Sequence, residues 1–252
     1  KTLARFGVET TYYDPLIGAD IASLTRPNTR LIYMESPGSL TFEIQDVPAI
    51  VAAARRAGVL TVLDNTWATP LFFKPMRHGV DIAVYAATKY VGGHSDIMMG
   101  LIVAKPELYR SLKLACHAMG YCAAPDDCYL AARGLRTMDV RLRRHEENGL
   151  ALARWLQARP EVACVMHPAL PGDPGHELWR RDFAGSSGLF GIVLRPFDDR
   201  AVAAMLDGMK LFGMGASWGG YESLLIPTKP QASRSATTWA PGGPTLRMHV
   251  GL

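Results

Sequence analysis

The stretch VLTVLDNTWATP at residues 59–70, followed by DIAVYAATKYVGGHSD at residues 81–96, decides the fold. In each stretch a short apolar run leads to a polar side chain, Asp64 in the first and Lys89 in the second. Short apolar runs of this kind are typical of buried strands in a parallel sheet. We therefore expect the carboxylate and the amine at neighbouring strand ends, where open α/β sheets bind their ligands.

The residues around this pair alternate strand and helix signals. Asp46 is placed to cap a helix over residues 46–58, with Pro48 in its first turn and Gly58 at its end. Strands are expected at residues 31–36, 59–63, 82–86 and 99–104. This order predicts an α/β fold whose mostly parallel sheet is covered on both faces.

The pattern changes after about residue 134. A long helix is expected at about residues 139–158, stopped by Pro160, and another helix at 201–209. Shorter strands are expected at residues 162–166, 189–196, 210–215 and 245–251. We therefore divide the chain into a large domain, residues 1–134, and a smaller C-terminal α+β domain, residues 135–252.

Composition narrows the function classes. The chain has 48% hydrophobic and 20% charged residues, as soluble globular proteins do, and no apolar run approaches the length of a membrane helix. The first ten residues lack the apolar core of a secretory signal, so we expect a cytoplasmic protein without membrane contact. A net charge of +4 is too small for a nucleic-acid-binding surface. The basic residues between 133 and 144 are interpreted as the solvated face of one amphipathic helix.

Motifs for several other chemistries are absent. The sequence has no G-x-S-x-G, no Walker loop and no dinucleotide-binding fingerprint, which disfavours hydrolases, nucleotidases and dehydrogenases. No metal site is expected, because the cysteines and histidines lack ligand spacing. Reduced thiols are expected at Cys116, Cys122, Cys128 and Cys164.

The pair Asp64 and Lys89 suits pyridoxal phosphate (PLP), whose aldehyde binds a lysine and whose ring nitrogen binds an anion. Asp64 should be largely desolvated, so it needs a cation such as the pyridinium to stay ionised. Taken singly, Lys89 fits a surface lysine at a strand end equally well. Asp64 likewise fits a cap of the following turn through Asn65 and Thr66.

Four further residues are weaker candidates. The hydroxyl and the backbone N–H of Thr88 are placed to hold a phosphate. The guanidinium of Arg247 suits an amino acid's carboxylate, although an exposed arginine on an edge strand is the alternative. Ser217 and Trp218 lie in a turn of small residues that is consistent with a pocket wall.

Six segments together resemble the Cys/Met-metabolism family of PLP-dependent enzymes over essentially the whole chain: ESPGSLTFEIQDVPAI, LDNTWATP, AATKYVGGHSD, SSGLF, SWGGYESL and TLRMHVGL. The resemblance implies the PLP-dependent transferase-like fold of the aspartate aminotransferase type, fold type I. It implies that Lys89 carries the cofactor and that Asp64 pairs with its ring nitrogen. Arg247 would bind the substrate carboxylate, and Ser217 and Trp218 would line the substrate pocket.

Two positions depart from the family pattern. Ala86 stands where many relatives have a phosphate-binding serine, so Thr88 is expected to contribute more. Ser39 stands where an asparagine usually reaches the cofactor, which is typical of the β-lyase subgroup. The resemblance also implies an upstream segment, with a phosphate loop and a ring-stacking tyrosine, and a last helix that these 252 residues do not contain.

The implied reaction is the cleavage of an amino-acid thioether, L-cystathionine, to homocysteine, pyruvate and ammonia in methionine biosynthesis. A homotetramer built as a dimer of dimers is implied. Cystathionine γ-lyase, γ-synthase or sulfhydrylase chemistry, or an inactive truncated relative, are the alternatives.

Overall fold

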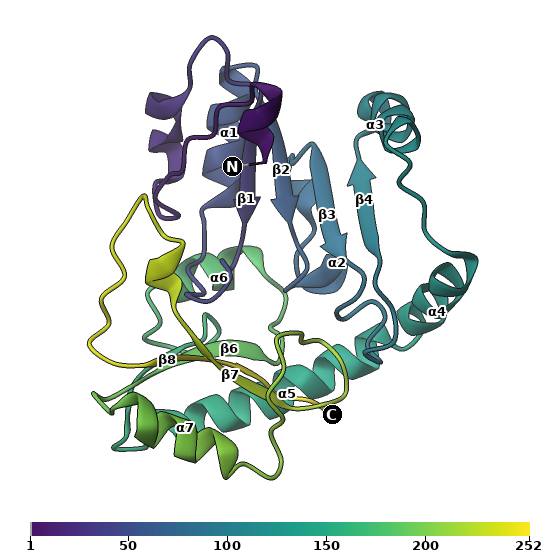
Figure 1. Ribbon diagram of the computed structural model, residues 1–252. Helices are drawn as coiled ribbons and strands as arrows, with labels where there is room; N and C mark the ends of the chain where they lie inside the picture. Colours follow the sequence, from purple (N-terminus) through teal and green to yellow (C-terminus); the bar gives the residue numbers. More distant parts are fainter. Residues whose placement is uncertain (1) are drawn as a thin grey trace.

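The computed structural model describes residues 2–252 as two sheets connected by a long helix (Figure 1). The first sheet has the order β1-β2-β3-β4, in which β1, β2 and β3 are parallel and β4 is antiparallel to β3. The predicted α/β fold with a mostly parallel sheet is confirmed. The strands are β1 (Leu31–Glu35), β2 (Leu60–Asp64), β3 (Ile82–Ala86) and β4 (Gly100–Ala104).

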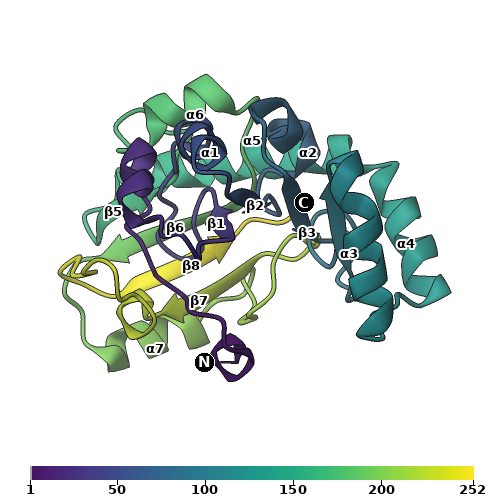
Figure 2. The same cartoon turned by 90° about the horizontal axis from the view of Figure 1, so that it is seen from above.

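One face of this sheet is well covered. Helix α1 (Val47–Arg56) begins at the predicted cap, where Asp46 accepts a hydrogen bond of 3.1 Å from the N–H of Ala49. In Figure 2, α1 and α2 (Thr69–Phe72) lie on the same side of the strands. Side chains that point to this side, such as Met34 and Leu63, are fully buried. The chain also forms the 3-10 helices η1 (Leu3–Phe6), η2 (Gly18–Leu24) and η3 (Pro75–His78).

The opposite face of the sheet is partly open. On this face Leu31, Tyr33, Leu60 and Ile102 are 39–53% exposed, whereas Val62 and Ile82 at its centre are buried. The prediction that both faces are covered was therefore wrong for residues 2–252. Helix α3 (Pro106–Ala118) lies beyond β4 and has no buried residue, and α4 (Pro125–Leu135) follows it.

The second sheet is antiparallel, in the order β5-β6-β8-β7. Its strands are β5 (Val162–Met166), β6 (Leu189–Leu194), β7 (Leu224–Thr228) and β8 (Thr245–His249). Around it lie α5 (Met138–Gln157), α6 (His176–Asp182), α7 (Asp199–Asp207) and the short η4 (Pro230–Ala232). Leu246 and Met248 of β8 pack in a core with residues of α5, α7 and β6.

Two expectations for this half were wrong. Residues 210–215 form a loop, in which only Gly213 makes an isolated bridge to Leu224. The strand β7 was not predicted, because it contains Pro227, which cannot donate to a sheet ladder. A proline is tolerated there since β7 is an edge strand.

The basic stretch at residues 133–144 also differs from the prediction. It is divided between α4, which ends at Leu135, and α5, which begins at Met138. Arg141 is buried rather than solvated, and its guanidinium donates to the carbonyls of Tyr90 and Gly134. The carbonyls satisfy the donors of this buried cation.

The two sheets share one hydrophobic cluster, which includes Leu63 and Phe73 from the first half and Phe183 and Leu189 from the second. A hydrogen bond of 2.8 Å from Trp67 Nε1 to the carbonyl of Leu189 links the loop after β2 to β6. This packing brings the carboxyl ends of β2 and β3 towards the second sheet (Figure 1).

Candidate active site

The carboxylate of Asp64 is fixed at the end of β2. Its Oδ1 accepts hydrogen bonds from the N–H of Thr66 at 2.9 Å and from Thr66 Oγ1 at 2.6 Å. The same hydroxyl accepts from the N–H of Ala86 at 2.8 Å, at the end of β3. The turn cap considered for Asp64 is therefore present, and it orients the carboxylate. Thr66 ties the ends of the two strands together.

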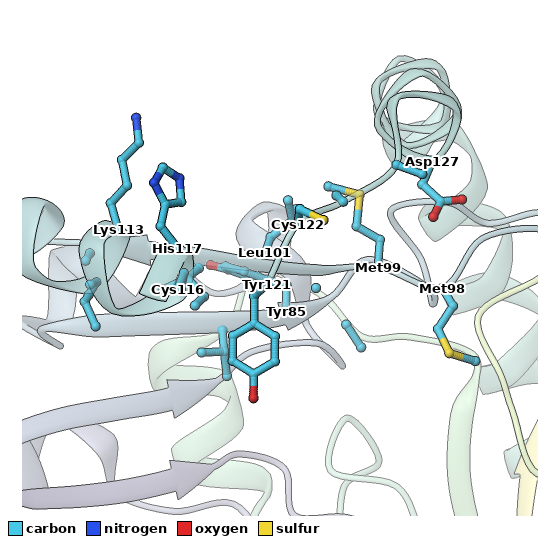
Figure 3. A pocket seen from close by; sticks show the side chains of 18 of the residues that line it. Tyr85, Met98, Met99, Leu101, Lys113, Cys116, His117, Tyr121, Cys122 and Asp127 are labelled. Atoms are coloured by element: carbon cyan, nitrogen blue, oxygen red, sulfur yellow. The ribbon is translucent and has the colours of Figure 1, made fainter. Parts of the chain in front are cut away.

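Asp64 faces a cavity of about 720 Å³, within the size range of small-molecule sites. Figure 3 shows side chains around it: Lys113 and His117 project from α3, Asp127 from α4, and Met98 and Met99 precede β4. The cavity separates the open face of β3 and β4 from these two helices.

A second carboxylate, Glu35, lies next to Asp64 because β1 and β2 pair in register at these residues. Burial raises the pKa of Glu35, and the charge of Asp64 raises it further. Ser39 donates to Glu35 Oε1 at 2.6 Å, so its hydroxyl is directed at this carboxylate. Glu35 was missed by the sequence analysis, although it closes an apolar run as Asp64 does.

Thr88 is already engaged with the backbone of Met99. Its N–H donates to the Met99 carbonyl at 3.2 Å, and its hydroxyl accepts from the Met99 N–H at 3.0 Å. Both groups that were expected to hold a phosphate thus bond to Met99 in this structure. Thr88 stays a predicted cofactor residue, but it is the weakest of them.

Lys89 meets two of the predicted substrate residues. Its Nζ donates to Ser217 Oγ at 2.8 Å and lies 5.2 Å from the centre of the Trp218 ring. Burial lowers the pKa of Lys89, and the nearby charge of Arg247 lowers it further. The environment thus makes it easier for the amine to lose its proton, and the neutral amine is the form that attacks an aldehyde or accepts a proton.

Arg247 lies on β8 between β6 and β7, so it is not on an edge strand as the alternative interpretation required. It is partly buried, and its Nη2 donates to the carbonyl of Ala216, the residue before Ser217. The fold therefore gathers Lys89, Ser217, Trp218 and Arg247, while Asp64 lines the cavity at the end of the neighbouring strand.

Within residues 2–252, no cluster of histidine, cysteine or acidic side chains is arranged to hold a metal ion. In the same part of the chain, every helix is too short or too polar to cross a bilayer. All four cysteines are free thiols.

The profile of the family described as "Cys/Met metabolism PLP-dependent enzyme" matches residues 1–251. The chain belongs to this family. The Cys/Met metabolism enzyme "Cystathionine beta-lyase MetC" of Escherichia coli K12 is 46% identical, over 100% of this chain and 65% of that protein. The "L-alanine/L-glutamate racemase" of Wolbachia pipientis wMel is 45% identical, over 99% of this chain and 62% of that protein.

A solved structure extends the likeness to the fold. The cystathionine gamma synthase of Xanthomonas oryzae pv. oryzae, in complex with aminoacrylate and cysteine, has a TM-score of 0.89 and 33% identity. The match covers 99% of this chain and 66% of that one. The chain therefore spans slightly less than two thirds of the length of these proteins.

Pyridoxal phosphate is the cofactor of this family, and the residues of the site fit it. Asp64 provides an oriented carboxylate on a cavity of suitable size. Lys89 provides an amine whose pKa is lowered by burial and by the charge of Arg247. Anionic and amine groups are what the ring nitrogen and the aldehyde of PLP require.

Proposed function

We propose that this chain forms part of a PLP-dependent carbon–sulfur β-lyase that cleaves L-cystathionine to homocysteine, pyruvate and ammonia. The observation that carries the proposal is the hydrogen bond between the Lys89 amine and Ser217 Oγ, beside the guanidinium of Arg247. The amine of Lys89 is suited to proton transfer, and the guanidinium of Arg247 beside it is suited to bind an amino-acid carboxylate.

Each residue has a distinct task in this proposal. Arg247 binds the substrate carboxylate through two parallel hydrogen bonds and so directs the Cα–H bond towards Lys89. The neutral Lys89 amine removes the Cα proton, and Ser217 holds that amine in place. Asp64 holds the ring nitrogen of the cofactor, and Trp218 covers the amine. The bound cofactor withdraws the electron pair left on Cα.

The choice of β-elimination is supported by the 46% identity to a named cystathionine β-lyase and by Ser39 in place of the usual asparagine. γ-Elimination is the alternative, because a solved structure that resembles this chain with a TM-score of 0.89 is a γ-synthase. Racemisation is a further possibility raised by the Wolbachia relative. We also propose a cytoplasmic homotetramer, by analogy with the family, with small amino-acid thioethers as ligands.

The products decide between these reactions. The protein, supplied with PLP and L-cystathionine, should release pyruvate and homocysteine in equal amounts, measured by mass spectrometry. Release of 2-oxobutyrate and cysteine would assign a γ-lyase instead. Conversion of L-alanine to D-alanine without pyruvate from cystathionine would assign a racemase. The Lys89→Ala variant is the control, since it should form none of these products.

A further inference from the structure

The turn that carries Ser217 and Trp218 is held by a histidine with no role so far. His249, the last residue of β8, is 1% exposed. Its Nε2 accepts a hydrogen bond of 3.1 Å from the N–H of Gly219, and its Nδ1 lies 3.0 Å from the carbonyl of Glu222. Since Nε2 accepts and a carbonyl cannot donate, the single ring proton belongs on Nδ1.

Gly219 is where the turn touches the backbone of Lys89. Its φ is +85°, and a Cβ at this position would lie 2.9 Å from the Cα and the carbonyl carbon of Lys89. Only glycine permits both this conformation and this approach. A bond to the Gly219 N–H therefore sets how the turn sits on Lys89.

The side chain of His249 is buried among other aromatic rings. The ring of His249 lies 5.1 Å from that of His145 and 5.9 Å from that of Tyr90, and Tyr90 lies 5.4 Å from Trp218. Burial, aided by the nearby His145, Arg247 and Lys89, lowers the pKa of His249 to about 3. The ring is thus neutral at physiological pH, as its acceptor role at Nε2 requires.

We propose that His249 is a positioning residue: its bond to the Gly219 N–H holds Ser217 against the amine of Lys89. The proposal rests on the proposed function for the meaning of the Lys89–Ser217 contact. Arg247 binds the turn at Ala216, before Ser217. His249 binds it at Gly219, after Ser217.

Two variants separate the two hydrogen bonds of His249. In His249→Gln, the side-chain oxygen reaches the position of Nε2 and can accept from Gly219. In His249→Asn, the amide group reaches only the position of Nδ1, so the bond to Glu222 can persist while the bond to Gly219 is lost. Because the two variants also differ in size, the exchange of the Gly219 amide, which reports on this one hydrogen bond, separates the bond from core packing.

Amide hydrogen exchange at Gly219 is the first readout, and it does not depend on the reaction. In the wild-type protein this amide should be protected, unlike an exposed loop amide. Protection should persist in His249→Gln and fall about tenfold or more in His249→Asn. An unprotected Gly219 amide in the wild type overturns the proposal, and this holds even if neither variant folds.

Kinetics give the second readout. Because Ser217 acts on Lys89, His249→Asn should lower kcat about tenfold while KM for cystathionine changes little. His249→Gln should recover most of kcat. Equal losses in the two folded variants, or a loss in KM alone, would contradict the proposal. If the wild type releases no keto acid but Gly219 is protected as expected, the proposed reaction fails and the placement of the turn by His249 stands.

Discussion

At the scale of single residues, the site depends on how Asp64 is oriented. Its Oδ1 is held by the N–H and the hydroxyl of Thr66, and that hydroxyl also binds the N–H of Ala86. These hydrogen bonds orient the carboxylate. Such preorganisation is what an anion needs in order to hold a pyridinium nitrogen.

Asp64→Asn keeps the shape of the side chain and removes its charge. We expect weaker PLP binding and a rate of pyruvate formation at least about 100-fold lower, because losing a buried charge partner costs about 3–5 kcal/mol. The dissociation constant is measured by titrating the cofactor's visible absorbance. Thr66→Val, which removes the hydroxyl that donates to Asp64 and accepts from the N–H of Ala86, is the matched variant and should cost about tenfold. An Asp64→Asn protein within tenfold of the wild-type rate would remove Asp64 from its proposed role.

The sequence was sufficient to place Asp64 and Lys89 at the ends of neighbouring strands, since each follows an apolar run. It was insufficient for Thr88, whose polar groups are taken by the backbone of Met99, eleven residues away. Glu35 was missed for a similar reason, because its place beside Asp64 depends on the register between β1 and β2. Local patterns predict which residues end a strand, and the pairing of segments decides what those residues meet.

At the scale of secondary structure, elements with strong local signals were predicted well. Helix α1 has a cap, a proline in its first turn and a glycine after its end, and the structure has it at the predicted place. Helix α3 was missed although Leu108, Leu112 and Cys116 have helical spacing, and none of its residues is buried. The strand β7 escaped because Pro227 argues against a strand unless the strand is known to lie at an edge.

The cap of α1 can be tested by itself. Asp46→Ala should lower the free energy of unfolding by about 1 kcal/mol, since the N–H of Ala49 loses its partner. Asp46→Asn keeps an acceptor and removes only the charge that pairs with Arg181. It should recover most of the loss, because exposed ion pairs contribute little. Urea unfolding measures both; equal destabilisation by the two variants would show that the ion pair matters more than the cap.

At the scale of the whole molecule, a mostly parallel sheet in the first half and mixed helices and strands in the second could be predicted, but the open face of the first sheet could not. The apolar runs of β1 and β2 indicate burial on both sides, whereas Tyr33 and Leu60 are exposed. An apolar run indicates that its residues are suited to burial. Whether another segment within residues 2–252 packs over them is seen only in the structure.

Buried histidines should make the fold sensitive to mild acid. Burial lowers the pKa of His167 to about 4 and that of His249 to about 3. In the unfolded chain, histidines take up protons below about pH 6.5, while these two stay neutral in the fold. The free energy of unfolding should therefore decrease as the pH is lowered. Between pH 7 and pH 5 each should cost about 2 kcal/mol.

The measurement is the slope of unfolding free energy against pH. The slope is proportional to the number of protons that the chain takes up on unfolding, and His249→Gln should reduce that number by about one. If the wild-type stability is the same at pH 5 as at pH 7 and His249→Gln changes nothing, the two rings are not buried in the neutral form.

The central claim is that the amine of Lys89 holds the PLP aldehyde. Borohydride reduction of the PLP-loaded protein, followed by peptide mapping, tests it directly. We predict a single pyridoxyl label on Lys89, lost in Lys89→Ala and retained in a variant of the α3 residue Lys113, which also lines the cavity near Asp64. A label on another lysine, or none in a preparation that forms pyruvate from cystathionine, would contradict the claim.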